Sequence, residues 1–231
     1  MNPAQIAELL QPFLGEADDQ RLTTNGLLNI STYIDLLLRW NARINLTAIR
    51  QPEEIVTRHF GESLFTARHL FPASKDVGAD APVRPAGPTS ARLIDVGSGA
   101  GFPGLPIKIW SPDLQVTLIE SNQKKATFLR EVIRILTLTD INVSHGRAEN
   151  YPNQAEVVTL RAVENFTKTL PAAANLVAPG GRLAILIGES QLENQKRLTP
   201  NFAWLPPIPI PKSSSRIVSI GLRKPCPHAP K

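Results

Sequence analysis

Residues 93–104 run from an apolar segment into a dense set of glycines: Leu93-Ile94-Asp95-Val96-Gly97-Ser98-Gly99-Ala100-Gly101-Phe102-Pro103-Gly104. The apolar residues predict a β-strand over 92–96, and Pro103 is typical of the first turn of a helix. Because glycine has no Cβ, the main chain of such a turn can pass close to a ligand at the carboxyl edge of a parallel sheet. The stretch therefore predicts a strand, a ligand-binding turn and a helix.

Downstream, short apolar runs alternate with helical patterns. Strands are predicted at 92–96, 116–120, 141–144, 157–161 and 183–187, and helices at 103–110, 122–136 and 164–177. This alternation predicts a right-handed, mostly parallel sheet with helices on both faces. Two further strand candidates, at 202–205 and 216–222, predict an antiparallel pair at one edge. The expected fold class is thus α/β, with a doubly wound, mostly parallel, seven-stranded sheet.

The segment before the glycine-rich turn has a different organisation. Amphipathic patterns at 3–14, 24–42 and 52–70 predict three helices, and we therefore expect a helical amino-terminal extension over 1–71. Residues 72–90 contain several prolines and glycines and almost no bulky apolar side chain, which predicts a linker. The sheet domain is then expected over 91–224, followed by a disordered tail over 225–231.

Composition limits the functional classes. The 231 residues carry 25 Lys and Arg against 20 Asp and Glu, and residues 182–231 hold eight of the basic residues and two of the acidic ones. This distribution weakly favours a polyanionic partner. No apolar run approaches the ~18 residues that would span a bilayer, and the start lacks a leader-like pattern, so we expect a cytoplasmic protein. The single cysteine, Cys226, excludes a disulfide framework, and the histidines show no metal-ligand spacing.

Two cofactor motifs overlap in the glycine-rich turn. Gly99, Gly101 and Gly104 spell G-x-G-x-x-G, which is typical of dinucleotide sites. Gly97, Gly99 and Gly101 follow Asp95 in the D-x-G-x-G-x-G pattern of S-adenosylmethionine enzymes. We favour the second motif because the Asp95 carboxylate, placed beside the turn, would welcome a cationic methionyl group.

Acidic residues after the next two strands and a later turn support the same cofactor. Glu120 ends the second strand, where it could pair with both ribose hydroxyls, and Glu149 follows the third strand, near the expected place of adenine. The turn over 177–183 is also similar to that of class I methyltransferases. An NAD-dependent oxidoreductase remains the alternative, although no Tyr-x-x-x-Lys motif accompanies the turn.

The residues also restrict the methyl acceptor. Carbon-5 methylation of pyrimidines needs a thiolate, and Cys226 lies far from the motif. Exocyclic amine methylation usually uses an Asn or Asp before Pro-Pro after the fourth strand, where this chain has Leu160-Arg161-Ala162-Val163. A nitrogen with a free lone pair, such as guanine N7, needs no general base and is compatible with this sequence. Arg161 is then expected to place a cation at the cofactor or the acceptor.

Several segments together resemble the ribosomal RNA small subunit methyltransferase G family, also called glucose-inhibited division protein B. The resemblance rests on residues 40–50 (WNARINLTAIR), Arg58-His59 with Ser63, residues 94–104, residues 146–149 (GRAE) and Arg161-Ala162. It implies a class I methyltransferase domain over 91–224 that uses S-adenosylmethionine. The implied reaction is N7 methylation of one guanine in the decoding region of 16S ribosomal RNA, by a monomer in the bacterial cytoplasm.

The resemblance also implies site residues. The implied cofactor contacts are Gly97, Phe102, Ala148, Glu149 and Arg161, to which class I geometry adds Gly99 and Glu120. The candidates for lining the acceptor cleft are Asn41, Arg58 and His59. No metal is implied.

One position departs from the family pattern. Ile187 stands where a lysine is expected before Gly188, so RNA contacts are expected from other cations, with Lys212, Arg216, Arg223 and Lys224 as candidates. This departure keeps open a third hypothesis, a non-catalytic RNA-binding module for ribosome assembly.

Overall fold

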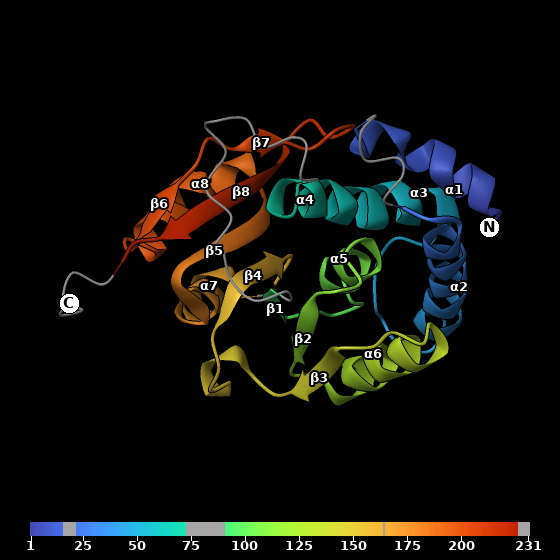
Figure 1. The fold of residues 1–231 in the computed structure, drawn as a ribbon, viewed down its shortest axis with the longest axis horizontal. Helices are drawn as coiled ribbons and strands as arrows, with labels where there is room; N and C mark the ends of the chain where they lie inside the picture. The colour runs from blue at the N-terminus through green and yellow to red at the C-terminus, as the bar shows by residue number, and fades with distance from the viewer. Residues whose placement is uncertain (16–21, 73–90, 164, 226–231) are drawn as a thin grey trace.

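The computed structural model describes residues 1–15, 22–72, 91–163 and 165–225. Of the predicted linker only Pro72 falls in these ranges, and of the predicted tail only Pro225 does, so these two predictions, and Cys226, lie outside the described residues. The described part forms one sheet with helices on both faces (Figure 1).

The strands of the sheet follow the order β3-β2-β1-β4-β5-β8-β6, and the short β7 pairs with β8. They are β1 (Arg92–Val96), β2 (Gln115–Glu120), β3 (Ile141–His145), β4 (Ala155–Arg161), β5 (Val177–Gly188), β6 (Phe202–Trp204), β7 (Ile208–Pro209) and β8 (Arg216–Arg223). Strands β1 to β5 are parallel, whereas β8 is antiparallel to β5, β6 and β7. The predicted mostly parallel sheet and its antiparallel edge are confirmed, and β7 is an addition within the proline-rich segment.

Helices cover the two faces of the sheet separately. Helices α5 (Gly104–Trp110) and α6 (Gln123–Ile135) pack on one face, and α7 (Phe166–Asn175) and α8 (Leu192–Leu198) pack on the other. Successive strand residues alternate between the faces: Leu93 joins the core under α5 and α6, whereas Ile94 joins the core under α7. The doubly wound arrangement is therefore confirmed. The sequence did not predict α8, a short and polar helix whose one buried residue is Gln195.

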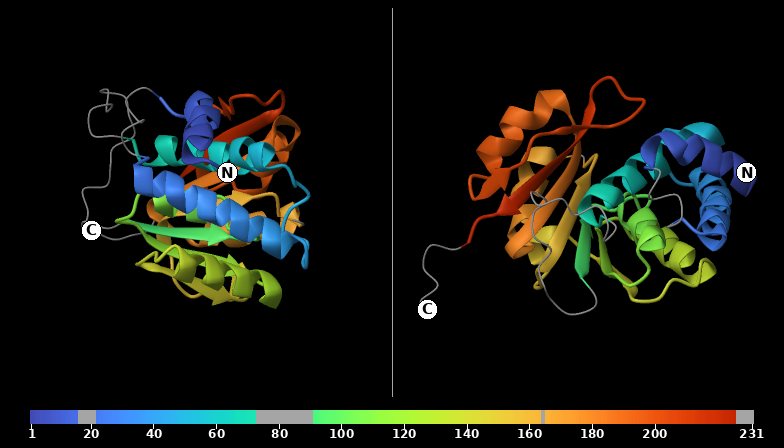
Figure 2. Two further views of the ribbon diagram at one scale, coloured as in Figure 1. Left: turned by 90° about the vertical axis from the view of Figure 1, so that its right-hand side faces the viewer. Right: turned by 45° about the horizontal axis from the view of Figure 1, so that its top comes forward.

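The amino-terminal helices lie on the α5 and α6 face. They are α1 (Pro3–Leu10) with a 3-10 turn at Gln11–Phe13, α2 (Thr24–Asn41), α3 (Pro52–Ile55) and α4 (Glu62–Leu70). Helix α4 lies beside α5, and α1 and α2 lie outside them (Figure 2). A wider π-helical turn, η2 (Val56–Gly61), joins α3 to α4. Tyr33 and Phe60 share one continuous core with Leu105 and Phe128, so the extension and the sheet domain are packed together.

Candidate functional site

The glycine-rich turn after β1 is held against β2 by its main chain. Gly97 N and Ser98 N both donate to Ile119 O, at 2.9 and 3.1 Å. Gly97, Gly99 and Gly101 have φ angles of +67°, +56° and +91°, which side-chain-bearing residues rarely adopt. At Gly97 an added Cβ would also lie 2.9 Å from Val163 Cγ1. The turn therefore needs glycine for its conformation and for its close approach to Val163, which follows β4.

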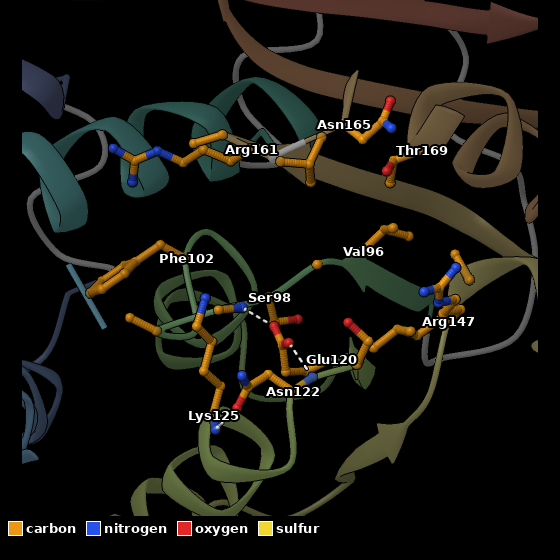
Figure 3. A pocket seen from close by; sticks show the side chains of 18 of the residues that line it. Val96, Ser98, Phe102, Glu120, Asn122, Lys125, Arg147, Arg161, Asn165 and Thr169 are labelled. Atoms are coloured by element: carbon orange, nitrogen blue, oxygen red, sulfur yellow. Dashed lines mark hydrogen bonds between the residues drawn. The ribbon is translucent and has the colours of Figure 1, made fainter. Parts of the chain in front are cut away.

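A cavity of about 750 Å³ opens above this turn, at the carboxyl ends of β1, β2 and β4. Its size lies in the range of small-molecule sites. The structure brings together along it all seven residues predicted for the cofactor: Gly97, Gly99, Phe102, Glu120, Ala148, Glu149 and Arg161. Figure 3 shows Glu120 and Asn122 on one wall, with Arg161, Asn165 and Thr169 across the cavity from them. We call this space the first cavity.

The structure adds lining residues that the sequence analysis missed. Asn122 is the N-cap of α6 and follows β2, and Asn165 is the N-cap of α7 and follows β4. Lys125, Arg147 and Lys168 add positive charge to the wall. An Asn before a helix and after a strand is a recognisable signal in sequence, and it would have indicated Asn122 and Asn165.

The Glu120 carboxylate is fixed at the end of β2. Its Oε2 accepts a hydrogen bond from Gly99 N at 2.8 Å, and its Oε1 accepts one from Asn122 N at 2.7 Å (Figure 3). Each carboxylate oxygen has a further acceptor position. A buried, oriented carboxylate of this kind fits a ligand that donates from two adjacent hydroxyls.

Asp95 does not line the first cavity, and the expectation that its carboxylate would neighbour a methionyl cation is wrong. The side chain is fully buried: Oδ1 accepts from Thr159 Oγ1 at 2.7 Å and Oδ2 accepts from Gly104 N at 3.3 Å. Burial raises the pKa of Asp95 to about 6. Since β1 is buried on both faces, no polarity pattern indicates which side this residue faces. Its carboxylate lies at the N-terminus of α5 instead.

Aromatic rings from the amino-terminal helices support the other side of the turn. Tyr33 of α2 stacks on Phe102 with ring centroids 5.4 Å apart, and Phe102 stacks on His59 at 4.6 Å. The Tyr33 hydroxyl donates a hydrogen bond to Ala100 O in the turn. Burial raises the pKa of Tyr33 well above its usual value, so the hydroxyl keeps its proton. The extension thus helps to build the cavity wall.

A second cavity, of about 390 Å³, adjoins the first. The two share five lining residues: Thr47, His59, Arg161, Ala162 and Val163. Beyond this common wall, the second cavity is lined by Ile187 and by charged side chains of η2, α4 and β8. No local pattern in the sequence indicates this cavity, because its walls come from distant parts of the chain.

One buried glutamate gathers the charged side chains of the second cavity. Glu62 lies 3.0 Å from Arg161 Nη2 and 3.4 Å from Arg58 Nε, and it also contacts Arg216. Its side chain is 2% exposed, whereas those of Arg58 and Arg216 are 44% and 23% exposed. Burial raises the pKa of Glu62, and the three arginines oppose this shift. Three cations against one anion leave this wall positively charged.

The structure separates the three candidates for the acceptor cleft. Arg58 lines the second cavity, and His59 lines both cavities. Asn41 lines neither, because its amide is used behind the wall: Oδ1 accepts from Leu46 N and Thr47 N at 2.9 and 3.1 Å, and Nδ2 donates to Thr47 O at 2.9 Å. Asn41 therefore positions the loop that carries Thr47.

The four cations expected to contact RNA in place of a lysine at position 187 lie in different surroundings. Arg216 lines the second cavity together with Ile187. Arg223 donates to Val177 O, and Lys224 donates to Pro200 O at 3.1 Å. Lys212 is exposed. Only Arg216, of these four, is placed at a described cavity.

Within the described ranges, no three His, Cys, Asp or Glu side chains are grouped so that they could hold a metal ion. Nor does any helix there have the length and apolar character needed to cross a membrane.

Comparisons with known proteins agree with this geometry. Residues 27–205 match the family model described as GidB, rRNA small subunit methyltransferase G. The chain is 37% identical over 196 residues to the ribosomal RNA small subunit methyltransferase G of Xylella fastidiosa strain 9a5c, covering 83% of this chain and 84% of that protein. It is 45% identical over 168 residues to the protein of the same name from Chloroflexus aggregans, covering 70% and 64%.

Solved structures show the same fold at low sequence identity. The crystal structure of M. jannaschii TYW2 in complex with AdoMet is 16% identical, with a TM-score of 0.51 over 61% of this chain and 72% of that one. The Methanococcus jannaschii fibrillarin pre-rRNA processing protein is 16% identical, with a TM-score of 0.50 over 60% and 68%. Three observations point to the same family. They are the sheet order, the match of residues 27–205 to the family model, a span of 179 residues, and the identity to its relatives. The chain belongs to the rRNA small subunit methyltransferase G family.

Proposed function

We propose that the first cavity binds S-adenosylmethionine and that the second cavity receives the acceptor base. As a member of its family, the chain is an S-adenosylmethionine-dependent methyltransferase that acts on guanine N7 of 16S ribosomal RNA. The observation that carries the assignment of the cavities is their common wall. Residues 161–163, at the carboxyl end of β4, line both spaces, so a donor in one and an acceptor in the other would meet there.

The residues of the first cavity fit the cofactor. Glu120 would accept from the two ribose hydroxyls, because its carboxylate is already oriented by Gly99 N and Asn122 N. The bare main chain at Gly97 leaves room for the methionyl part, while Ala148 and Glu149 would meet the adenine edge. Phe102 shapes the wall beside them. Arg161, whose Nη1 is buried without a hydrogen-bond partner among the described residues, would attract the methionyl carboxylate.

The same turn fits a dinucleotide poorly. In a dinucleotide site, the pyrophosphate takes the free amides at the N-terminus of the helix that follows the glycines. Here the Asp95 carboxylate accepts from Gly104 N, the first residue of α5, and it is buried there. The helix amide that a pyrophosphate would need is therefore already taken by a buried acid. This arrangement argues against the alternative that the chain is an NAD-dependent oxidoreductase.

The second cavity fits an acceptor that needs no base. When bound, S-adenosylmethionine supplies an electrophilic methyl group, and guanine N7 offers a lone pair that carries no proton. The chain then has to align the base and balance charge. A target base must leave its stack to reach such a cavity, and the partly exposed side chains of Arg58 and Arg216 at the wall suit the phosphates that accompany it.

The decoding region of 16S ribosomal RNA in the small subunit is the proposed location of the target. Lys125, Arg147 and Lys168 at the first cavity add to the positive field that would meet it. We place the chain in the bacterial cytoplasm because its RNA substrate is there. We also propose that it acts as a monomer, as the family resemblance implies.

Two measurements test the proposal. Calorimetry should detect binding of S-adenosylhomocysteine and no binding of NADH, and the reverse result would end the methyltransferase assignment. The protein should then be incubated with labelled cofactor and either small subunits, naked 16S RNA or large-subunit RNA, and the modified nucleotide mapped. Binding of RNA without transfer to any of these substrates would favour the assembly-module hypothesis.

A further inference from the structure

His59 stands at the boundary between the two cavities. It lies in the π-helical turn η2 and lines both spaces. One face of its ring stacks on Phe102, with an angle of 19° between the planes, and its Nε2 lies 2.8 Å from Thr47 Oγ1. The other ring nitrogen, Nδ1, is buried and has no hydrogen-bond partner among the described residues. Because solvent does not reach Nδ1 here, a small shift of the ring has to bring this unused nitrogen to the cavity wall when a ligand binds.

The surrounding hydrogen bonds determine which ring nitrogen carries the proton. Thr47 Oγ1 accepts a hydrogen bond from Ile49 N at 3.1 Å, and its single proton needs an acceptor. His59 Nε2 is the acceptor within reach. If Nε2 donated instead, the Thr47 proton would have no acceptor among the described residues. The Thr47 hydroxyl therefore favours the tautomer with the proton on Nδ1, which makes Nδ1 an unused donor.

The charges around His59 keep the ring neutral. Burial, together with the positive charges of Arg161, Arg58 and Arg216, lowers the pKa of His59 to about 3. Glu62, the anion of this group, is engaged with these three arginines. A neutral ring does not repel a sulfonium donor, nor the positive charge that a purine acquires when its N7 is methylated.

We propose that His59 is the specificity-determining residue of the acceptor site, and that its Nδ1 donates a hydrogen bond to O6 of the target guanine. The proposal rests on the proposed function. Guanine presents two acceptors, N7 and O6, on one edge, whereas adenine presents N7 beside an N6 amino donor. A donor that holds O6 at the wall between the cavities leaves the adjacent N7 facing the first cavity. Adenine in the same place would bring its N6 amino donor against the Nδ1 donor of His59.

Two substitutions separate this role from a merely structural one. The amide nitrogen of asparagine is as many bonds from the main chain as His59 Nδ1, and that of glutamine as many as Nε2. His59→Asn can therefore replace the donor to O6, whereas His59→Gln can replace only the contact with Thr47. Both variants lose the imidazole ring that stacks on Phe102, so each is the control for the other.

The experiment measures kcat/KM on small subunits with guanine, adenine or 2-aminopurine at the methylated position. 2-Aminopurine keeps N7 and lacks O6. The wild type should prefer guanine over 2-aminopurine by about ten- to a hundredfold, the range expected for one buried hydrogen bond. His59→Asn should retain most of this preference, and His59→Gln should lose it. Thr47→Val should weaken the preference as well, because without the Thr47 hydroxyl the His59 proton can lie on either ring nitrogen.

Calorimetry with S-adenosylhomocysteine monitors the first cavity, and both His59 variants should bind it equally. Equal loss of guanine preference in His59→Asn and His59→Gln, or full preference in His59→Gln, would overturn the role of Nδ1. A wild type that binds S-adenosylhomocysteine but methylates no guanine would instead refute the proposed function. The two failures are thus distinguishable.

Discussion

Alanine at Gly97 should weaken both the fold and the cofactor site, whereas alanine at Gly180 should weaken only the fold. Gly97 and Gly180 have nearly equal φ angles, +67° and +73°, so the same substitution imposes the same left-handed backbone on alanine. That conformation costs about 1–2 kcal/mol. Reduced freedom of the unfolded chain offsets about 0.4–1 kcal/mol of this. Gly180→Ala, which has open space around its Cβ, should therefore lower the free energy of unfolding by about 1 kcal/mol.

Gly97→Ala adds a steric conflict to this backbone cost. Its Cβ would lie 2.9 Å from Val163 Cγ1, and both residues line the first cavity. Overpacking of this kind costs about 1–3 kcal/mol, so we expect Gly97→Ala to lower the free energy of unfolding by about 2–4 kcal/mol. Moving the turn or Val163 also reshapes the wall that meets the cofactor. The affinity for S-adenosylhomocysteine should fall at least about tenfold, a loss of about 1.4 kcal/mol.

Urea unfolding and calorimetry at one temperature measure both quantities for the two variants. Gly180→Ala is the matched control, because Gly180 does not line either described cavity. It should bind S-adenosylhomocysteine as the wild type does. Equal affinities in Gly97→Ala and Gly180→Ala would refute the placement of the cofactor against the main chain at Gly97.

Three further predictions concern groups around the two cavities. Tyr33→Phe keeps the ring but removes the donor to Ala100 O, so the free energy of unfolding should fall by about 1–2 kcal/mol in urea, and an unchanged value would show that this bond contributes nothing. Glu62→Gln leaves three arginines without their shared anion and should cost about 3 kcal/mol or more, seen as a lower melting temperature. The neutral state of His59 contributes stability above pH 6.5, and this is lost as the pH falls toward about 3. Between pH 7 and pH 5 the wild type should therefore lose about 2 kcal/mol relative to His59→Asn, and parallel stability curves would contradict the lowered pKa.

The strands and the glycine-rich turn could be predicted from sequence because their signals are local. A buried strand such as β5 is a run of apolar residues, and a turn that approaches a ligand requires glycine. The residues predicted for the cofactor were likewise found at one cavity, since parallel strands end at the same edge of a sheet.

Other parts of the site depend on contacts between distant segments. Arg161 and Glu62 are 99 residues apart, and Arg216 lies still further along the chain, so no periodic pattern joins them. The π-helical turn that carries Arg58 and His59 interrupts a helix without any proline or glycine at its start. Asp95 was misplaced because both faces of β1 are buried, and polarity alone cannot choose between them.

The most direct test of the account is to map the methyl group. Small subunits whose 16S RNA lacks the modification should be incubated with the protein and labelled cofactor, and N7-methylguanine located by aniline-induced strand cleavage. We predict label at N7 of one guanine in the decoding region, and loss of that label in Gly97→Ala but not in Gly180→Ala. Label on another atom or base, or equal labelling by the two variants, would contradict this prediction.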